Sequence, residues 1–270
     1  MCRKRFLLLS FDVEEFDMPL EYGQIISEQE QLETGYNGLE ALMNVIDASS
    51  IEATFFTTAN FAQYFPDAIK TISQKHEIAS HTFYHSHFEV EDLLSSKKKL
   101  EEIISKPVHG LRMPRMRKVE MNDVKQAGYQ YDSSINPSFI PGRYNNLHLS
   151  RAPYYENEML RFPVSVSPTL RLPLFWLSFK NFPYHFYLNL VKRALMRDGY
   201  VCLYFHPWEF INLDSYKIPN YAKRWAGEKL QRRLKNLIED LKPLGDFVSM
   251  GRYIGEQILT KELYQSQSGL

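Results

Sequence analysis

Short apolar runs alternate with longer amphipathic stretches along most of the chain. Apolar and β-branched runs of a few residues are typical of buried strands, and apolar positions spaced by three and four are typical of helices. The runs predict strands at residues 4–11, 53–57, 77–80, 108–112, 129–133, 160–166, 200–205 and 246–250. The amphipathic stretches predict helices at residues 38–47, 60–74, 91–105, 119–127, 184–197 and 222–241. We expect Thr34 or Asn37 to cap the first of these helices.

Alternating strands and helices predict a parallel sheet covered by helices, an α/β fold. About seven such units suit a closed or nearly closed barrel, and an open doubly wound sheet is the alternative. We expect one domain over residues 1–270, interrupted by an aromatic-rich insertion at about 136–183, where Pro, Tyr, Asn and Arg are frequent. No GxGxxG or GxxxxGK sequence occurs, so neither phosphate-binding fingerprint is met.

The net charge and the apolar runs limit the partners and the location that we expect. Lys+Arg and Asp+Glu are both 32, so the net charge is zero and we expect no nucleic-acid partner. No apolar run is long enough for a transmembrane span. The four apolar residues after Arg5 are too few for a signal peptide, so we expect a cytoplasmic protein. Residues 170–182, with Arg171 and Lys180, could alternatively lie on a membrane surface.

Carboxylates follow the first predicted strand. Side chains alternate faces along a strand, so Asp12 and Glu14 should point to one side, and Phe11 and Val13 to the other. Two acids on one face are costly unless they share a cation or a proton. The alternative is that Glu14 and Glu15 are exposed loop acids.

Histidine and arginine follow other strands. A helical turn after residue 80 would place His81 and His85 on one face, where both imidazoles could bind one metal ion. Arg112 could hold a carboxylate, and His206, fixed by the next residue, Pro207, could act as a general acid or base. Structural roles for each are the alternative. Together with Asp12 and Glu14 they suggest metal-assisted hydrolysis.

These motifs resemble the polysaccharide deacetylase family, the NodB-homology or carbohydrate esterase family 4 group. The resemblance is carried by the Ser-Phe-Asp-Val-Glu start, the His-Thr-Phe-Tyr-His box at 81–85 and the His-Pro-Trp-Glu box at 206–209. It implies a distorted (β/α)7 barrel. It also implies one divalent metal ion, zinc first, with cobalt or manganese as alternatives.

The resemblance also implies roles for single residues. Asp12 matches the catalytic base, Arg112 the residue that orients it, and His206 the general acid. Glu14, His81 and His85 match the metal ligands, although the usual motif has two adjacent aspartates and Glu15 could compete with Glu14. Asp132 lies where a further motif should begin, and could tune His206 or pair with Arg112. We expect the remaining contacts to substrate from Pro114, Asp132 and Trp208.

The implied function is removal of an N-acetyl or similar N-acyl group from a sugar, in a polysaccharide or in a lipid- or nucleotide-linked glycan precursor. A metal-free cyclic amidohydrolase or deformylase, or a non-catalytic glycan-binding module, is the alternative. Arg115, Arg117 and Lys118 should form a solvated loop or hold a substrate phosphate. The aromatic residues of the insertion should wall a glycan groove or pack in the core: Tyr144, Tyr154, Tyr155, Phe175, Trp176 and Phe179.

Overall fold

The apolar runs of the chain form a sheet that curls around a polar and aromatic interior. The structure is a computed structural model that describes residues 4–259. The main sheet contains β1 (Phe6–Val13), β2 (Thr54–Thr57), β3 (Glu77–Ser80), β4 (Gly110–Leu111), β5 (Tyr131–Asp132), β8 (Tyr154–Glu156), β9 (Met159–Arg161), β10 (Tyr200–Phe205) and β11 (Asp246–Phe247). A separate antiparallel hairpin consists of β6 (Phe139–Ile140) and β7 (Tyr144–Asn145).

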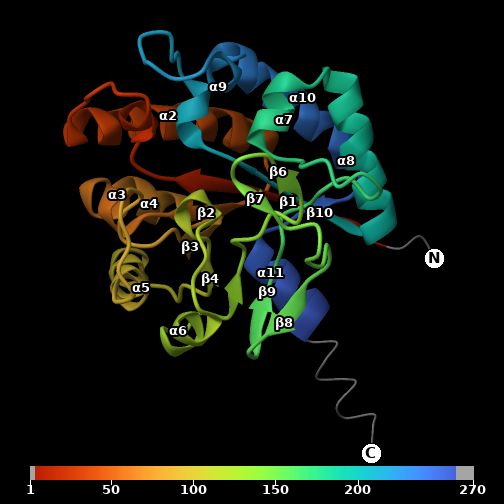
Figure 1. Ribbon diagram of the computed structural model, residues 1–270, viewed down its shortest axis with the longest axis horizontal. Helices are drawn as coiled ribbons and strands as arrows, with labels where there is room; N and C mark the ends of the chain where they lie inside the picture. Colours follow the sequence, from red (N-terminus) through yellow and green to blue (C-terminus); the bar gives the residue numbers. More distant parts are fainter. Residues whose placement is uncertain (1–3, 260–270) are drawn as a thin grey trace, which may run out of the picture.

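The strand order is β10-β1-β2-β3-β4-β5-β9-β8, with β11 also paired to β1. Every pairing from β10 through to β9 is parallel, and only β8 runs antiparallel. After β9 the chain crosses back, and the Ser165 N–H donates to the Cys202 carbonyl of β10 at 2.9 Å. The predicted distorted α/β barrel is therefore confirmed, as a sheet that curls into a half-barrel (Figure 1).

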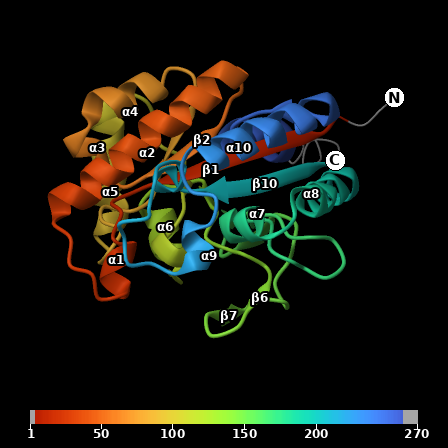
Figure 2. The same cartoon turned by 90° about the horizontal axis from the view of Figure 1, so that it is seen from above.

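Helices cover the outside of the sheet on both sides (Figure 2). The α-helices are α1 (Met18–Glu21), α2 (Glu28–Ser49), α3 (Ala59–Tyr64), α4 (Pro66–Ile72), α5 (Asp92–Ile104), α6 (Met121–Gln126), α7 (Trp176–Asn181), α8 (Tyr184–Asp198), α9 (Asn220–Lys223), α10 (Glu228–Leu241) and α11 (Met250–Ile254). Tighter turns are η1 (Pro114–Met116), η2 (Pro207–Phe210) and η3 (Lys242–Leu244), and the wider turn η4 (Gly255–Leu259) follows α11.

Three predicted helices have different limits in the structure. α2 begins ten residues before the predicted start at 38, and its N-cap is Ser27, whose Oγ accepts the Glu30 N–H at 3.1 Å, so neither Thr34 nor Asn37 caps it. The predicted helix 60–74 is two helices, because Pro66 starts α4 and lacks the N–H that a continuous helix needs. The predicted helix 222–241 is interrupted before α10 at Gly227, where φ is 78°.

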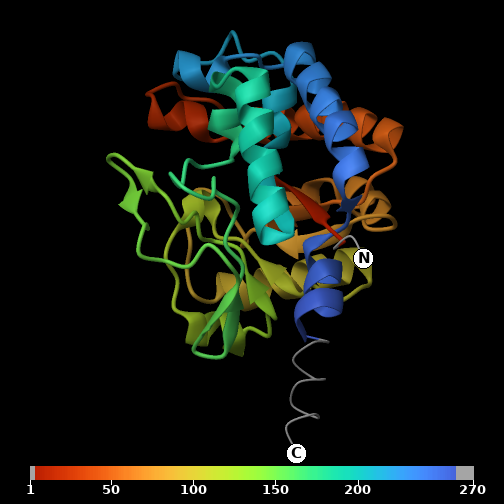
Figure 3. The same cartoon turned by 90° about the vertical axis from the view of Figure 1, so that its right-hand side faces the viewer.

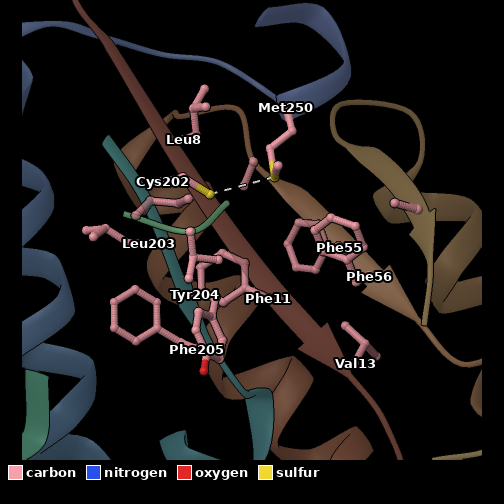
Figure 4. Packing of buried hydrophobic residues seen from close by; sticks show 14 of the residues in the cluster. Leu8, Phe11, Val13, Phe55, Phe56, Cys202, Leu203, Tyr204, Phe205 and Met250 are labelled. Carbon is pink, nitrogen blue, oxygen red and sulfur yellow. Dashed lines mark hydrogen bonds between the residues drawn. The ribbon is translucent and has the colours of Figure 1, made fainter. Parts of the chain in front are cut away.

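Alternation along β1 separates the core from the interior of the barrel. The rings of Phe11, Phe55 and Phe205 pack together, with centroid distances of 5.2 and 6.1 Å from Phe11 (Figure 4). The intervening positions of neighbouring strands include Phe56 and Tyr204, which face the guanidinium of Arg112 instead. The strand therefore buries one row of side chains under helices and directs the other, which contains Asp12, toward the interior.

The position of Lys180 argues against the alternative that residues 170–182 lie on a membrane surface. Lys180 is fully buried and donates to the Ala222 carbonyl at 2.7 Å, so it cannot reach a lipid surface. Its buried position follows from its place on α7, which packs against α9. Across the described residues 4–259, we find no helix with both the length and the apolar character needed to cross a bilayer.

Candidate active site

The carboxyl ends of the parallel strands surround a cavity of about 320 Å³. Its lining residues come from the ends of β1 and β10, the loop after β3, the β6–β7 hairpin, and the helical segments α1, η1, α7, η2 and α9. This volume lies at the lower end of the range typical of small-molecule pockets. Five of the predicted site residues line this cavity: Asp12, Glu14, His81, His85 and His206. The structure therefore brings together residues that are far apart in sequence.

Three potential metal ligands meet at the floor of the cavity. The Glu14 Oε2 atom lies 3.1 Å from Nε2 of His81 and 3.1 Å from Nε2 of His85. One ligand atom from each residue lies within 4.8 Å of the others, and all three side chains are buried. The Trp208 indole N–H donates to the other carboxylate oxygen of Glu14 at 3.1 Å, which fixes the carboxylate further.

Both imidazoles are oriented by a partner on their far side. His81 Nδ1 donates to the Arg112 carbonyl at 2.7 Å, and His85 Nδ1 lies 2.9 Å from Oδ1 of Asp17. Metal-binding histidines commonly use such a partner to fix the ring and to present the opposite nitrogen. Asp17 was not predicted from the sequence, because its contact with His85 bridges residues 68 positions apart.

The two histidines do not lie on a helical turn, contrary to the sequence prediction. Residues 81–85 form a loop in which Thr82 has a φ of 64°. The Ala59 N–H donates to the Thr82 carbonyl at 3.0 Å, and the Asn60 N–H donates to the Phe83 carbonyl at 2.9 Å. The first turn of α3 therefore holds this loop, and the loop brings the two rings to 5.8 Å between centroids.

Asp12 is bound to Arg112 inside the barrel. The Arg112 guanidinium donates to Asp12 Oδ1 at 2.6 Å and to the Ser10 hydroxyl at 2.9 Å, and it stacks 4.1 Å from the Phe56 ring centroid. Burial alone would lower the pKa of Arg112, but the charge and hydrogen bond of Asp12, with smaller contributions from Cys202 and Tyr204, together raise it. Arg112 thus remains charged, and it leaves the second oxygen of Asp12 directed to the cavity.

His206 stands across the cavity from the β3 loop. Its Nε2 lies 4.0 Å from Oδ2 of Asp12, and its Nδ1 lies 3.0 Å from Oε1 of Glu209. The same Glu209 oxygen accepts the His206 backbone N–H at 2.7 Å, and its other oxygen lies 3.0 Å from Nζ of Lys180. Glu209 and Lys180 are fully buried. The sequence analysis did not assign Glu209 or Lys180 to the site, although Glu209 belongs to the motif at 206–209.

Aromatic rings enclose His206. The Trp208 ring stacks on it at a centroid distance of 4.9 Å, and the Trp176 ring meets it edge-on at 5.1 Å. These contacts restrict the imidazole to one orientation while Nε2 still faces the cavity. Of the six aromatic residues considered in the insertion, Tyr144, Phe175 and Trp176 line the cavity.

The carboxylates and imidazoles of the site shift one another's pKa values. Burial would raise the pKa of Glu14, but the neighbouring imidazoles of His85, His206 and His81 hold it well below its ordinary value. Burial would lower the pKa of His85, but Glu14 and Asp17 raise it to about 9. The pKa of His206 is likewise raised against burial by Glu14, Glu209 and Asp12, so its protonated form is favoured.

Helix α2 packs directly behind both halves of the site. A Cβ atom at Gly35 would lie 2.5 Å from the Glu14 carbonyl oxygen, and one at Gly38 would lie 2.4 Å from the Pro207 carbonyl oxygen. Real Cβ contacts are never this short, so the helix can approach only where these side chains are absent. The spacing between the Glu14 segment and η2 is thereby set by one rigid element.

Several predicted site residues lie elsewhere. Glu15 turns away from the histidines and accepts hydrogen bonds from Thr58 and Asn60 at 2.9 and 2.6 Å. Asp132 is fully buried and pairs with Arg161 at 2.9 Å, so among the described residues its ion pair is neither with His206 nor with Arg112. Pro114 is buried beside the cavity without lining it.

Of the basic loop, only Arg115 reaches the cavity wall. Its Nη2 lies 2.8 Å from Oδ2 of Asp17 and its Nε lies 2.7 Å from Oε1 of Glu21. Arg115 is exposed, as expected for a solvated loop, and its guanidinium is already paired with two carboxylates. Arg117 and Lys118 do not line the cavity.

Comparison with known proteins covers part of these motifs, including His81, His85 and Arg112. The polysaccharide deacetylase family model matches residues 32–131. The resemblance to the polysaccharide deacetylase family is confirmed. A comparison with curated proteins finds no match.

Solved structures of polysaccharide deacetylase candidates share the fold. One from Mycobacterium smegmatis has a TM-score of 0.65 at 20% identity, over 96% of this chain and 92% of that chain. One from Pseudomonas aeruginosa PAO1 has a TM-score of 0.65 at 14% identity, over 94% and 93%. Puue allantoinase has a TM-score of 0.63 at 16% identity, over 95% and 92%. At these identities the likeness concerns the fold.

Proposed function

We propose that this chain is a metal-dependent hydrolase that removes an N-acetyl or similar N-acyl group from a sugar of a polysaccharide or glycan precursor. The observation that carries the proposal is the Glu14–His81–His85 cluster beside Asp12 and His206 in one cavity. The match to a family named for polysaccharide deacetylation supports it independently. We further propose that residues 1–270 form a single catalytic domain.

The residues present fit a divalent ion. Two imidazole nitrogens and one carboxylate are a ligand set typical of catalytic zinc, and cobalt or manganese could occupy it. Hydrogen bonds to Arg112 and Asp17 hold both rings with Nε2 toward Glu14, as a bound ion would require. Such an ion would polarise the acyl carbonyl and make a water molecule more acidic.

Two residues of the chain would move protons. Asp12, oriented by its hydrogen bond from Arg112, would accept a proton from the attacking water. His206 would donate a proton from Nε2 to the leaving amine, with Glu209 holding Nδ1 and stabilising the protonated ring. The 4.0 Å between His206 and Asp12 puts both groups within reach of one scissile bond.

Metal content tests the proposal together with acyl release. We expect about one divalent ion per chain in the purified protein and none in a His81→Ala/His85→Ala variant. A His87→Ala/His148→Ala variant, which removes two exposed histidines, is the matched control and should keep the ion. Acetate release from N-acetylated oligosaccharides should follow metal content and stop on chelation.

Two outcomes would overturn the proposal. Protein that binds no metal after addition of zinc or cobalt would redirect the search to metal-free hydrolysis of cyclic amides or formyl groups. Metal-loaded protein that binds glycans but releases no acyl group across a broad amide panel would indicate a binding module.

A further inference from the structure

The β6–β7 hairpin places an arginine at the mouth of the cavity. Arg143 lies in the turn of this hairpin, where its N–H donates to the Ile140 carbonyl at 3.0 Å. The hairpin projects from the body of the protein (Figure 3), and both Arg143 and Tyr144 line the cavity. The side chain of Arg143 is exposed, so a ligand entering the cavity can meet it.

The other charged side chains of the cavity already have partners. Asp12 pairs with Arg112, Asp17 and Glu21 pair with Arg115, and Glu14 contacts the two imidazoles. Within residues 4–259, by contrast, no carboxylate lies within ion-pairing distance of the Arg143 guanidinium. A guanidinium has several N–H donors in a planar fork that matches the oxygens of a carboxylate or phosphate. The cavity therefore has a cationic group available to a ligand.

Two tyrosine hydroxyl groups line the same cavity as Arg143. The hydroxyls of Tyr22 and Tyr221 lie 3.4 Å apart, both residues line the cavity, and their exposed fractions are 39% and 51%. Their mutual hydrogen bond raises the pKa of Tyr22 to about 12, and the charge of Arg143 acts in the opposite direction. The Arg143 guanidinium and this hydrogen-bonded tyrosine pair, from separate parts of the chain, thus line the same cavity.

We propose that Arg143, together with Tyr22 and Tyr221, binds an anionic group, a phosphate or a carboxylate, carried by the sugar substrate. This inference rests on the proposed deacetylase function and adds the substrate class: an acidic rather than a neutral N-acylated sugar. A neutral sugar would leave the guanidinium without a counter-charge, whereas an anionic one would supply it.

Calorimetric binding to the zinc-loaded protein tests this directly. The ligands are N-acetylglucosamine 1-phosphate, N-acetylglucosaminuronic acid and the neutral methyl glycoside of N-acetylglucosamine. We expect at least one anionic sugar to bind about tenfold or more tightly than the neutral one, the effect of a charged hydrogen bond. Arg143→Gln should abolish this preference, Arg143→Lys should retain part of it, and Arg193→Gln, an exposed charge on α8, should leave it intact.

The Arg143 variants are needed because an anionic group could also bind the metal and so give the same preference without Arg143. Equal binding of all three sugars, or a preference that survives in Arg143→Gln, would overturn the inference. The phosphate and carboxylate ligands separate the two sources of the charge. The binding assay does not depend on catalysis, so the two proposals can fail separately. A protein that prefers anionic sugars without releasing acetate would refute only the proposed function. A protein that deacetylates without this preference would refute only the inference.

Discussion

Replacing Lys180 with methionine tests whether a buried ion pair supports His206. Lys180 and Glu209 are fully buried with their charged atoms 3.0 Å apart, and Glu209 also holds Nδ1 of His206. Removing one partner of a buried pair leaves the other charge uncompensated, which costs about 3–5 kcal/mol. Because His206 still faces Glu209, we expect the lower end, about 3 kcal/mol, or a shift of about 1 M in the urea midpoint.

The stability difference between the wild type and Lys180→Met should depend on pH in a defined direction. In the wild type, burial opposes ionisation of Glu209, but Lys180 and His206 lower the pKa of this carboxyl group. The ionised Glu209 therefore stabilises the fold at neutral pH, and this stabilisation is lost as the pH falls through its folded pKa. Without Lys180 the buried carboxyl should have a raised pKa, and the variant should lose stability as the pH rises. The difference from the wild type should therefore be larger at pH 7.5 than at pH 5.

The assay is urea unfolding followed by tryptophan fluorescence at both pH values. Lys235→Met, which removes an exposed lysine from α10, is the control and should unfold like the wild type. A Lys180→Met/Glu209→Gln double variant removes both charges and should recover most of the lost stability. If the double variant is as unstable as Lys180→Met, or if the loss is equal at both pH values, the lysine stem and not its charge stabilises this region.

Three further predictions concern the site and the helix behind it. His206→Ala should keep its metal but lower kcat about 10²–10⁴-fold, because only the proton donor is removed. Arg112→Lys should lower kcat with little change in KM, because an ammonium cannot hold Asp12 and Ser10 in the same planar geometry. Gly38→Ala should destabilise the fold by about 1–3 kcal/mol in urea unfolding, because its methyl group would meet the backbone of η2.

Each of these has a contrary outcome. Full turnover in His206→Ala would remove that residue from proton transfer, and an unchanged kcat in Arg112→Lys would mean that Asp12 needs only a nearby charge. Gly255→Ala is the control for the glycine variant, since no atom lies within 4 Å of its added Cβ. Equal stabilities for the two glycine variants would contradict the close approach of α2.

Continuous apolar runs were the most predictable part of the fold. The strands at 77–80 and 200–205 have the predicted limits, because every residue of β10 and most of β3 are buried. The first turns of α2 were missed because residues 28–37 are mostly polar and lack a helical apolar period. β9 ends at Arg161, well before the predicted limit at 166, because the chain there leaves the sheet edge and crosses to β10.

The candidate site was predictable for residues that directly follow strands. Glu14, His81, His85 and His206 meet because parallel strands end at one edge of the sheet, although the helical turn assumed for the histidines is a loop held by α3. Asp17, Lys180 and Arg143 could not be assigned, because their contacts connect segments whose relative positions only the folded chain defines.

The pairing of β1 with β10 has a consequence for the order in which the protein is made and folds. On one side β1 pairs with β2 and β11, and on the other it pairs with β10, from Phe6 opposite Tyr200 to Phe11 opposite Phe205. Until the ribosome has released β10, that side of β1 is an apolar strand edge with unpaired backbone groups, a surface prone to association. His206 directly follows β10, so the pairing that covers this edge also delivers the proposed proton donor. A nascent chain therefore carries the proposed metal ligands, His81, His85 and Glu14, long before it can complete the proposed catalytic set.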